Sequence, residues 1–598
     1  MERKKNNLQF ATLKYRIEIN LSEKYCTIFS VESGRILFGF AVDSAVDGLE
    51  QEDLSEELLL SLFSPSDVVT SIVFDVKSNL WKKKQIIFEL YEQNILYFVR
   101  VEGESVRVLD LNYLLRRNGK ASFTQFEQIY APRFDWQKSQ VIFGSSESDS
   151  LSCQQWLSPP PFVYAFLSEQ ESVYCGVAAR PGENNFLSFD YLGSEGPCFR
   201  LTYEGHTQVN GEFESPKLVI GFGYTDKNEA VNGYITWLRS NGYLTQEEER
   251  IVPGWWREPI FCGWGQMRYD YRCDHDGHEN GNFVNVTDYC TEYLYRSYLK
   301  TMEEKAINPG TIIIDMGWAE QPALHTPDPQ KWTDMKGFIA EQHAMGRHVL
   351  LWFTPVVTDG LPLEACMTLD GRAVCPDPTS PEYARILAEE IRRMISDEPD
   401  CLNADGFKID FTQNTPSERG LFIGYINSFW GLINENNHKH LYKPLGERTN
   451  LIKTHGNKWG VEILKEYIRL IYVNMKKAKS DAVLITHTSN PYFSEVVDIL
   501  RLNDLDGSCE NVLGVMQNRA TIAKMCCKDW LLDTDNDLMY NRDRWRAYIR
   551  LQPQLGIPDT YYVSAIANSL ESFEESDYTL LRQVWNDYRE QRKQAQPQ

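Results

Sequence analysis

At 598 residues the chain is too long for one hydrophobic core, and a prior of about 150 residues per domain is compatible with two large domains as well as four smaller ones. An apolar content of 42% and a charged content of 24% are ordinary for a globular protein. The formal net charge of −23 excludes nucleic acid and anionic membrane surfaces as expected partners, because an acidic protein repels phosphates.

The N-terminal 20 residues contain neither an apolar run nor a small-residue cleavage site, so no signal peptide is predicted. No stretch of about 18 apolar residues indicates a membrane span. The 13 cysteines are scattered and odd in number, and Cys526 and Cys527 are adjacent. This pattern favours reduced thiols and a cytoplasmic location. No zinc-type spacing occurs, so neither a metal nor another cofactor is expected.

Residues 1–245 consist mainly of short runs with strand character separated by turns, which predicts a large β-sandwich, or supersandwich. A helical pattern at Asn228–Ser240 and the polar segment Thr245–Arg250 follow. We therefore expect a domain boundary between 245 and 246. The expected strands are Lys14–Asn20, Tyr25–Val31, Ile36–Val42, Ser71–Val76, Gln85–Leu90, Leu96–Glu102, Phe162–Leu167, Phe186–Tyr191 and Lys217–Phe222.

Residues 246–598 alternate between strand and helix patterns, which predicts a closed (β/α)8 barrel, also called a TIM barrel. Helical patterns include Asp334–Met345 and Pro381–Ile395, and a charged helix is expected at Asp577–Gln598. The predicted barrel strands are Pro259–Gly263, Thr311–Met316, His348–Phe353, Gly406–Phe411, Ala482–His487 and Ile499–Asn503.

The strand Gly406–Phe411 carries two charged residues among apolar ones. In an extended strand Lys408 and Asp410 point to the same side, and burying charge there is costly unless the charges are paired or used. The carboxyl ends of barrel strands form the active-site face. We therefore expect both side chains to reach the mouth of the barrel.

Other polar and aromatic side chains follow the predicted barrel strands and are candidates for contacts with a substrate. Cleavage of an acetal needs one carboxyl group that protonates the leaving oxygen and a second that stabilises the positive centre. Asp410 and Asp504 could meet only across a folded barrel mouth, where Lys408 would keep Asp410 ionised. The further candidates at strand ends are Trp264, Asp315, Trp318, Trp352, His487, Arg501 and Asp506.

An ordered set of motifs between residues 258 and 510 resembles the clan D retaining α-glycosidases, especially glycoside hydrolase family 36 (α-galactosidase-like), with some family 31 character. The family's first-strand motif, its "DDGW", "GLWxEP", "LDxxxPEV" and "KWDxN" motifs and its acid/base motif are similar, in that order, to Glu258–Trp264, Asp315–Trp318, Leu350–Pro355, Pro376–Tyr383, Lys408–Thr412 and Asn503–Asp506.

The resemblance implies a glycosidase that acts with retention on a small α-linked oligosaccharide or glycoside. Asp410 would be the nucleophile and Asp504 the acid/base. The remaining residues that the resemblance assigns to the −1 sugar site, or close to it, are Trp264, Asp315, Trp352, Lys408 and Asp506.

Three departures from the family pattern bear on specificity. Met316 replaces the second acid of "DDGW", Thr354 replaces the glutamate of "WxEPE", and His487–Pro491 stands where a glycine-rich stretch is usual. These changes keep open an α-glucosidase or transglycosylase of the family 31 type and a catalytically inactive carbohydrate-binding relative. A Schiff-base enzyme that uses Lys408 is a remote alternative, and a homo-oligomer is left open.

Two acidic clusters, Asp274–Asn280 and Asp533–Asp537, resemble sites for calcium in composition. Neither has the glutamate at position twelve that an EF-hand loop requires. Both are therefore expected to be solvated loops, and the first could instead contact a substrate.

Overall fold

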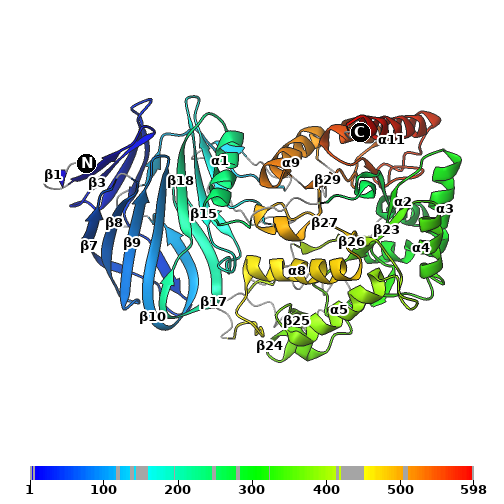
Figure 1. Cartoon of the computed structure of the whole chain (residues 1–598), viewed down its shortest axis with the longest axis horizontal. Coiled ribbons are helices and arrows are strands. Elements are labelled where there is room, and N and C mark those ends of the chain that lie inside the picture. Colours follow the sequence, from blue (N-terminus) through cyan, green and yellow to red (C-terminus); the bar gives the residue numbers. More distant parts are fainter. Residues whose placement is uncertain are drawn as a thin grey trace.

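The computed structural model contains antiparallel β-sheets on one side and a ring of parallel strands surrounded by helices on the other (Figure 1). This arrangement confirms the predicted fold class, a β-sandwich followed by a (β/α)8 barrel. The residues that the structure describes are 3–4, 7–66, 68–115, 122–134, 140–142, 159–193, 196–245, 251–277, 283–321, 323–412, 416–418, 450–502, 509–528 and 530–595.

The N-terminal part contains a six-stranded and a twelve-stranded sheet. The strands of the first, in spatial order, are β1 (Arg3–Lys4), β2 (Asn7–Ala11), β3 (Tyr15–Asn20), β4 (Tyr25–Ser30), β5 (Ile36–Ala41) and β11 (Phe123–Thr124). Those of the second, in chain order, are β6 (Ala45–Gly48), β7 (Ser55–Ser64), β8 (Thr70–Ser78), β9 (Lys83–Leu90), β10 (Asn94–Tyr113), β12 (Gln128–Tyr130), β13 (Gln140–Ile142), β14 (Val163–Leu167), β15 (Ser172–Ala178), β16 (Phe189–Tyr191), β17 (Phe199–Glu214) and β18 (Lys217–Tyr224).

Aromatic side chains join the two sheets. Tyr15 of β3 stacks on Phe222 of β18 with ring centroids 4.5 Å apart, and Phe38 of β5 meets Phe166 of β14 edge to face at 5.1 Å. All four rings are almost fully buried. Alternate residues of β3 point into this core, as the period-2 pattern predicts.

Eight parallel strands form the barrel. Their spatial order is β29-β28-β27-β26-β23-β20-β19-β30, and a parallel bridge between Asp533 and Ile557 links β29 to the chain just before β30, which closes the ring. The strands are β19 (Ile260–Cys262), β20 (Thr311–Ile314), β23 (His348–Phe353), β26 (Gly406–Ile409), β27 (Val483–Thr486), β28 (Ile499–Arg501), β29 (Leu531–Asp533) and β30 (Asp559–Thr560).

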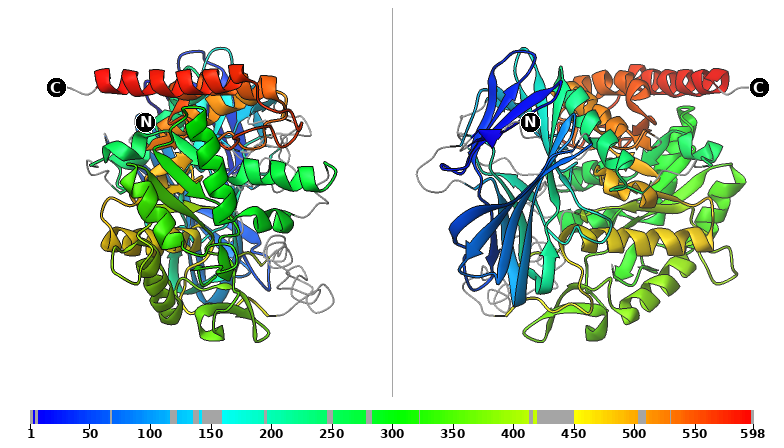
Figure 2. Two further views of the ribbon diagram at one scale, coloured as in Figure 1. Left: turned by 90° about the vertical axis from the view of Figure 1, so that its right-hand side faces the viewer. Right: turned by 60° about the vertical axis from the view of Figure 1, so that its left-hand side comes forward.

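Helices surround the barrel strands, and α11 extends along its outer edge (Figure 2). The α-helices are α1 (Lys227–Ser240), which follows the sandwich, and α2 (Trp264–Asp274), α3 (Glu292–Glu304), α4 (Met335–Ala344), α5 (Pro381–Ile395), α8 (Gly460–Ala478), α9 (Val512–Cys526), α10 (Arg542–Leu555) and α11 (Glu575–Ala595). Short elements are the 3-10 helices η2 (Gly254–Arg257), η3 (Phe283–Tyr289), η4 (Leu363–Ala365) and η6 (Pro491–Val496), and the strands β21 (Ala319–Gln321), β22 (Thr326–Pro327), β24 (Cys366–Leu369) and β25 (Arg372–Pro376).

A bulge in β17 joins the sandwich to the barrel. Glu204, which has a φ of 55°, accepts hydrogen bonds from the Ser417 hydroxyl (2.8 Å), the Glu418 backbone (2.8 Å) and the Trp459 indole (3.1 Å). His206 stacks on Trp459 at 3.5 Å and lies 2.6 Å from the Glu418 carboxylate. The sandwich therefore holds a barrel segment that follows β26.

The acidic segment Asp533–Asp537 is not a solvated loop, so that prediction is wrong. The segment begins at the end of β29, and its side chains are between 0 and 5% exposed. The sequence reasoning missed this strand and β30 because they contain only three and two residues. The second acidic cluster, Asp274–Asn280, is described only as far as Gly277.

None of the described helices is long and apolar enough to span a membrane. The cysteines in the described part of the chain are all free thiols, as expected, and most of them are buried.

Candidate active site

Asp410 lies directly after β26, at the carboxyl end of the barrel. The Trp352 indole donates a hydrogen bond to its Oδ2 at 3.2 Å, and the Phe411 backbone donates to its Oδ1 at 2.9 Å. Its side chain remains 17% exposed, whereas the side chains of Lys408, Arg501 and His487 are 3% exposed or less. Asp410 is therefore the carboxylate that this group presents to solvent.

Neighbouring basic side chains hold Asp410 in its ionised form. His487 Nε2 lies 3.4 Å from Oδ1, and Arg501 Nη1 lies 3.7 Å from Oδ2. Burial alone would raise the pKa of Asp410, but Arg501, the hydrogen bond and charge of His487, and Lys408 outweigh it. The pKa therefore lies well below the ordinary value. The result is a stable anion close to solvent, as a carboxylate nucleophile requires.

Lys408 points into the barrel, where Asp315 pairs with it. The Lys408 ammonium lies 2.6 Å from Asp315 Oδ2, and the Cys262 thiol donates to the same oxygen at 2.9 Å. Burial alone would lower the pKa of Lys408, but the Asp315 carboxylate outweighs it and raises this pKa well above the ordinary value. The amine therefore stays protonated and cannot attack a carbonyl, which removes support from the Schiff-base alternative.

The predicted tryptophans occupy different depths. Trp264 begins α2 and is half-buried, and Trp352 contacts Asp410 directly. Trp318 is 1% exposed, and its indole donates to the Trp352 carbonyl at 2.9 Å. Met316 is 3% exposed and packs in the hydrophobic core. Position 316 thus adds no acidic group beside Asp315.

The sequence did not reveal two further residues of the site, Asp535 and Tyr561. Arg501 Nε lies 2.9 Å from Asp535 Oδ2, and the Tyr561 hydroxyl donates to the same oxygen at 2.9 Å. Lys408 lies 5.2 Å from the centre of the Tyr561 ring. The signal for Asp535 was its place in an acidic segment that follows the short apolar run Leu531–Leu532. The loop interpretation obscured it.

Burial affects the other acids of this region. It raises the pKa of Asp533 to about 7, with a further contribution from the Asp535 charge. The pKa of Asp559, next to the barrel closure, is also raised by burial and by Asp533. The buried carboxyls of Asp533 and Asp559 thus both interact with the charge of Asp535, the partner of Arg501.

Asp504 and Asp506, the predicted acid/base and its neighbour, lie outside the described residues. The chain just before them is fixed. Arg501 ends β28, and the buried Arg519 guanidinium donates to the Leu502 carbonyl at 2.6 Å.

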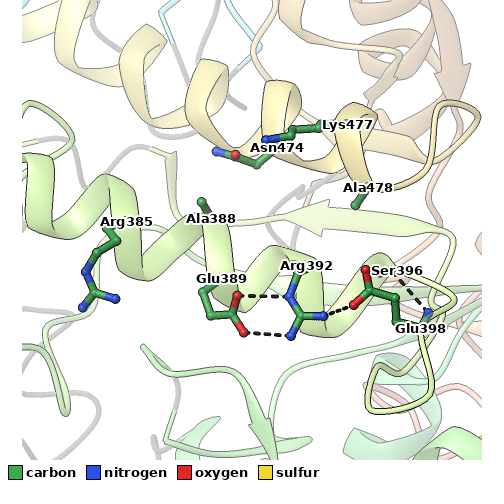
Figure 3. Close-up of a pocket in the computed structure, with 9 residues that line it drawn as sticks. All are labelled: Arg385, Ala388, Glu389, Arg392, Ser396, Glu398, Asn474, Lys477 and Ala478. Atoms are coloured by element: carbon green, nitrogen blue, oxygen red, sulfur yellow. Dashed lines mark hydrogen bonds and ion pairs between the residues drawn. The ribbon is translucent and has the colours of Figure 1, made fainter.

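A groove of about 620 Å³ lies between α5 and α8, with charged side chains on its walls (Figure 3). Arg392 in this groove pairs with Glu389, Glu398 and Asp400. Among the described residues, the one group of acids and thiols close enough to hold a metal consists of Glu398, Asp400 and Cys401, and Arg392 contacts all three of them. Because a cation already occupies this position, these residues do not fit a metal site.

Comparisons with known proteins show which family the barrel resembles. Residues 281–524 match the model described as the glycosyl hydrolases family 31 TIM-barrel domain. No curated protein matches the chain in sequence. A family 31 sulfoquinovosidase from E. rectale, solved with an aza-sugar inhibitor, is similar in structure with a TM-score of 0.56 and 11% identity, over 97% of this chain and 82% of that chain.

Two further solved structures are similar over most of the chain. A family 31 α-xylosidase from a soil metagenome, complexed with xylose, has a TM-score of 0.49 and 12% identity, over 99% of this chain and 84% of its own. A cycloalternan-degrading enzyme from Trueperella pyogenes has a TM-score of 0.49 and 11% identity, over 88% and 83%.

Residues 281–524 are thus similar to the family 31 TIM-barrel domain. This result supports the family 31 character of the sequence resemblance and does not single out family 36. The similarity to the sulfoquinovosidase extends over the sandwich as well, and it concerns the fold.

Proposed function

We propose that this protein is a retaining α-glycosidase of the family 31 type with Asp410 as its nucleophile. The observation that carries the proposal is the ionised and partly exposed Asp410 carboxylate at the carboxyl end of β26, within a barrel that matches the family 31 domain. A nucleophile of this kind has to be deprotonated before the substrate binds.

In the first step, an Asp410 oxygen bonds to the anomeric carbon while the bond from that carbon to the leaving oxygen breaks. Asp504 gives its proton to the leaving oxygen. Water then attacks the anomeric carbon, Asp504 takes the proton of that water, and the bond to Asp410 breaks. The sugar is released with its original configuration and the enzyme is restored.

The −1 sugar site in this proposal is built around Asp315 and Lys408. Their ion pair places both a hydrogen-bond acceptor and a donor beside the nucleophile. Trp264 and Trp352 supply aromatic surface, and Asp506, outside the described residues, is proposed as a further contact. The Trp318 indole donates to the Trp352 carbonyl, and Trp318 is proposed to act through that contact.

The substrate class that we propose is an α-glucoside or α-xyloside rather than an α-galactoside. The family 31 domain favours this choice, which the sequence interpretation had kept as an alternative. Met316 is consistent with it, because a buried thioether cannot replace the second acid that the family 36 resemblance implies for the sugar hydroxyls. Neighbours described as a sulfoquinovosidase and an α-xylosidase make those two glycosides worth including in a test.

The test is a panel of aryl α-glucoside, α-xyloside, α-sulfoquinovoside and α-galactoside, assayed with the wild type and Asp410→Asn. The proposal is supported if the wild type hydrolyses the α-glucoside, α-xyloside or α-sulfoquinovoside and Asp410→Asn does not. Turnover of the galactoside alone would restore the family 36 interpretation. Measurable sugar binding without any turnover would favour the inactive carbohydrate-binding alternative.

A further inference from the structure

Arg501 lies between two carboxylates that have different surroundings. Its Nε is 2.9 Å from Asp535 Oδ2, and its Nη1 is 3.7 Å from Asp410 Oδ2. The Arg501 side chain is 2% exposed and the Asp535 side chain 0%. The shorter and more deeply buried contact is therefore the one to Asp535.

The Asp535 carboxylate is itself held at both oxygens. The Tyr561 hydroxyl donates to Oδ2 at 2.9 Å, and the backbone of Asp537 donates to Oδ1 at 2.9 Å. The backbone of Asp535 donates in turn to Asp533 Oδ1 at 3.1 Å. The rigid end of the contact is thus Asp535, and the long arginine side chain is the part that needs fixing.

A guanidinium group is planar, and a contact at Nε fixes the direction in which the Nη atoms point. Without that contact, the group can turn about its side-chain torsions, and Nη1 loses its place at Asp410. The attraction between two unit charges falls as their separation grows, and it is strong only where water is excluded. The position of Arg501 therefore controls how strongly it stabilises the Asp410 anion.

We propose that Asp535 is a positioning residue that holds the Arg501 guanidinium against Asp410 and so keeps the nucleophile ionised. This inference deepens the proposed function, because the group that it acts on is the proposed nucleophile. Tyr561 completes the arrangement, since its hydroxyl fixes Asp535 and its ring faces Lys408.

Asp535→Asn tests the inference, because it removes the charge and keeps the size and a hydrogen-bond acceptor for Tyr561. Two effects of the substitution have opposite signs. The lost negative charge, acting through space, would lower the pKa of Asp410. A displaced Arg501 would raise it, because a cation then leaves the carboxylate.

The pH profile of kcat/KM between pH 3 and 6 separates the two effects, since it reports ionisations of the free enzyme. Among the described residues, the titratable and charged groups that face Asp410 are Lys408, His487 and Arg501, and behind them lie Asp315, Asp533 and Asp535. In the wild type we expect no loss of activity from protonation of Asp410 above the ordinary aspartate pKa of about 3.9. In Asp535→Asn we expect the acidic limb of the profile to shift to higher pH, into the range between pH 3 and 6. At pH 4, kcat/KM should then be roughly tenfold lower than in the wild type.

The matched control is Asp537→Asn, in the same buried segment. The buried Asp537 carboxylate forms its ion pair with Arg268, with Oδ1 3.6 Å from Arg268 Nη1. We expect this variant to keep the wild-type profile. Tyr561→Phe leaves the Lys408 contact in place and removes one of the two contacts of Asp535 Oδ2, so it should move the acidic limb in the same direction as Asp535→Asn, by less. The inference is overturned if the acidic limb of Asp535→Asn stays at the wild-type pH or shifts to lower pH.

Crystal structures of the variants distinguish this inference from the proposed function. If the wild type hydrolyses no glycoside of the panel, the proposed function fails, and the distance from Arg501 Nη1 to Asp410 Oδ2 decides the positioning role. An increase of that distance in Asp535→Asn but not in Asp537→Asn supports the role. The positioning role is overturned if this distance is equal in the two variants. It is also overturned if Arg501 keeps its wild-type position in Asp535→Asn at every pH.

Discussion

At the scale of single residues, Phe411 has a φ of 59°, in the left-handed region that a bulky side chain rarely adopts. This conformation costs on the order of 1 kcal/mol. It turns the backbone N–H of Phe411 onto Asp410 Oδ1, so the strain is used to fix the nucleophile. The Phe411 backbone thus orients the Asp410 carboxylate, and side chains of the barrel strands keep it ionised.

If Asp410 is the nucleophile, Asp410→Ala should lose activity by a factor on the order of 10⁴ or more. Azide can enter the space left by the side chain and attack from the same face. We therefore expect rescue by azide with an aryl α-glycoside and a β-glycosyl azide product, identified by NMR. An α-glycosyl azide would contradict retention through Asp410.

The Lys408–Asp315 pair gives a second prediction at this scale. Both side chains are 3% exposed, so Asp315→Asn leaves a buried ammonium without its counter-charge. A loss of about 3–5 kcal/mol in the free energy of unfolding is expected, measured by urea denaturation. Lys300→Gln, which removes a lysine that is 78% exposed and 4.0 Å from Glu304, should change it by less than about 1 kcal/mol.

At the scale of elements, β26 depends on its first residue. Gly406 has a φ of 146°, and a Cβ there would lie 2.0 Å from the Val483 carbonyl oxygen of β27. The neighbouring backbone cannot move without breaking the parallel ladder between the two strands. The nucleophile strand therefore reaches its register only with glycine at position 406.

Gly406→Ala should destabilise the protein by about 3 kcal/mol or more, because overlap with backbone adds to the conformational strain. Gly346→Ala is the matched control. Gly346 also has a positive φ, 74°, but a Cβ there has no neighbour within 4 Å. It should cost only about 1 kcal/mol. Thermal unfolding of the two variants measures the difference, and equal losses would show that the overlap with Val483 is relieved.

The end of β29 gives a prediction about pH. The folded-state pKa of Asp533, about 7, lies above that of the unfolded chain, so the folded protein binds the additional proton. This contribution to stability is fully present below pH 4 and is lost as the pH rises towards 7. Asp533→Asn should therefore gain stability relative to the wild type between pH 4 and 7, by up to a few kcal/mol in urea denaturation. A constant difference across that range would contradict the raised pKa.

Most elements could be predicted because their patterns are long enough to be periodic. The helix predicted at Pro381–Ile395 is observed with those bounds as α5, and the Ser380 side chain caps its first turn by accepting from the Tyr383 backbone. β29 and β30 have no such pattern, since two or three residues cannot show a period. Asp410 was recognised through its strand, whereas Asp535 was hidden because its strand was missed. Its contact with Arg501 depends on the closed ring, which the local sequence does not reveal.

At the scale of the whole molecule, the sandwich and the barrel are joined by buried polar contacts around Glu204 and His206. We keep the boundary between residues 245 and 246 as a proposal, because the strands of the sandwich end at Tyr224 and the first barrel strand begins at Ile260. The junction also reaches Glu418, eight residues after Asp410, so the sandwich supports the nucleophile side of the barrel.

Removal of Glu204 should weaken this junction. The side chain is fully buried and accepts three hydrogen bonds, so Glu204→Ala leaves several buried donors without an acceptor. A loss of about 2–4 kcal/mol in the free energy of unfolding is expected. Glu212→Ala, at an exposed position of the same strand, should be nearly neutral. A single unchanged calorimetric transition in Glu204→Ala would show that the two parts do not depend on this contact.

The order in which the chain is synthesised gives the barrel closure a consequence. Strand β26, which directly precedes Asp410, leaves the ribosome about 150 residues before β30. Strand β30 then completes the ring next to β19. Until then, neither Asp535 nor Tyr561 is in place beside Arg501. A nascent chain that already contains Asp410 should therefore have an unfinished pocket, and its catalytic power should arise only once the last two barrel strands have joined the first.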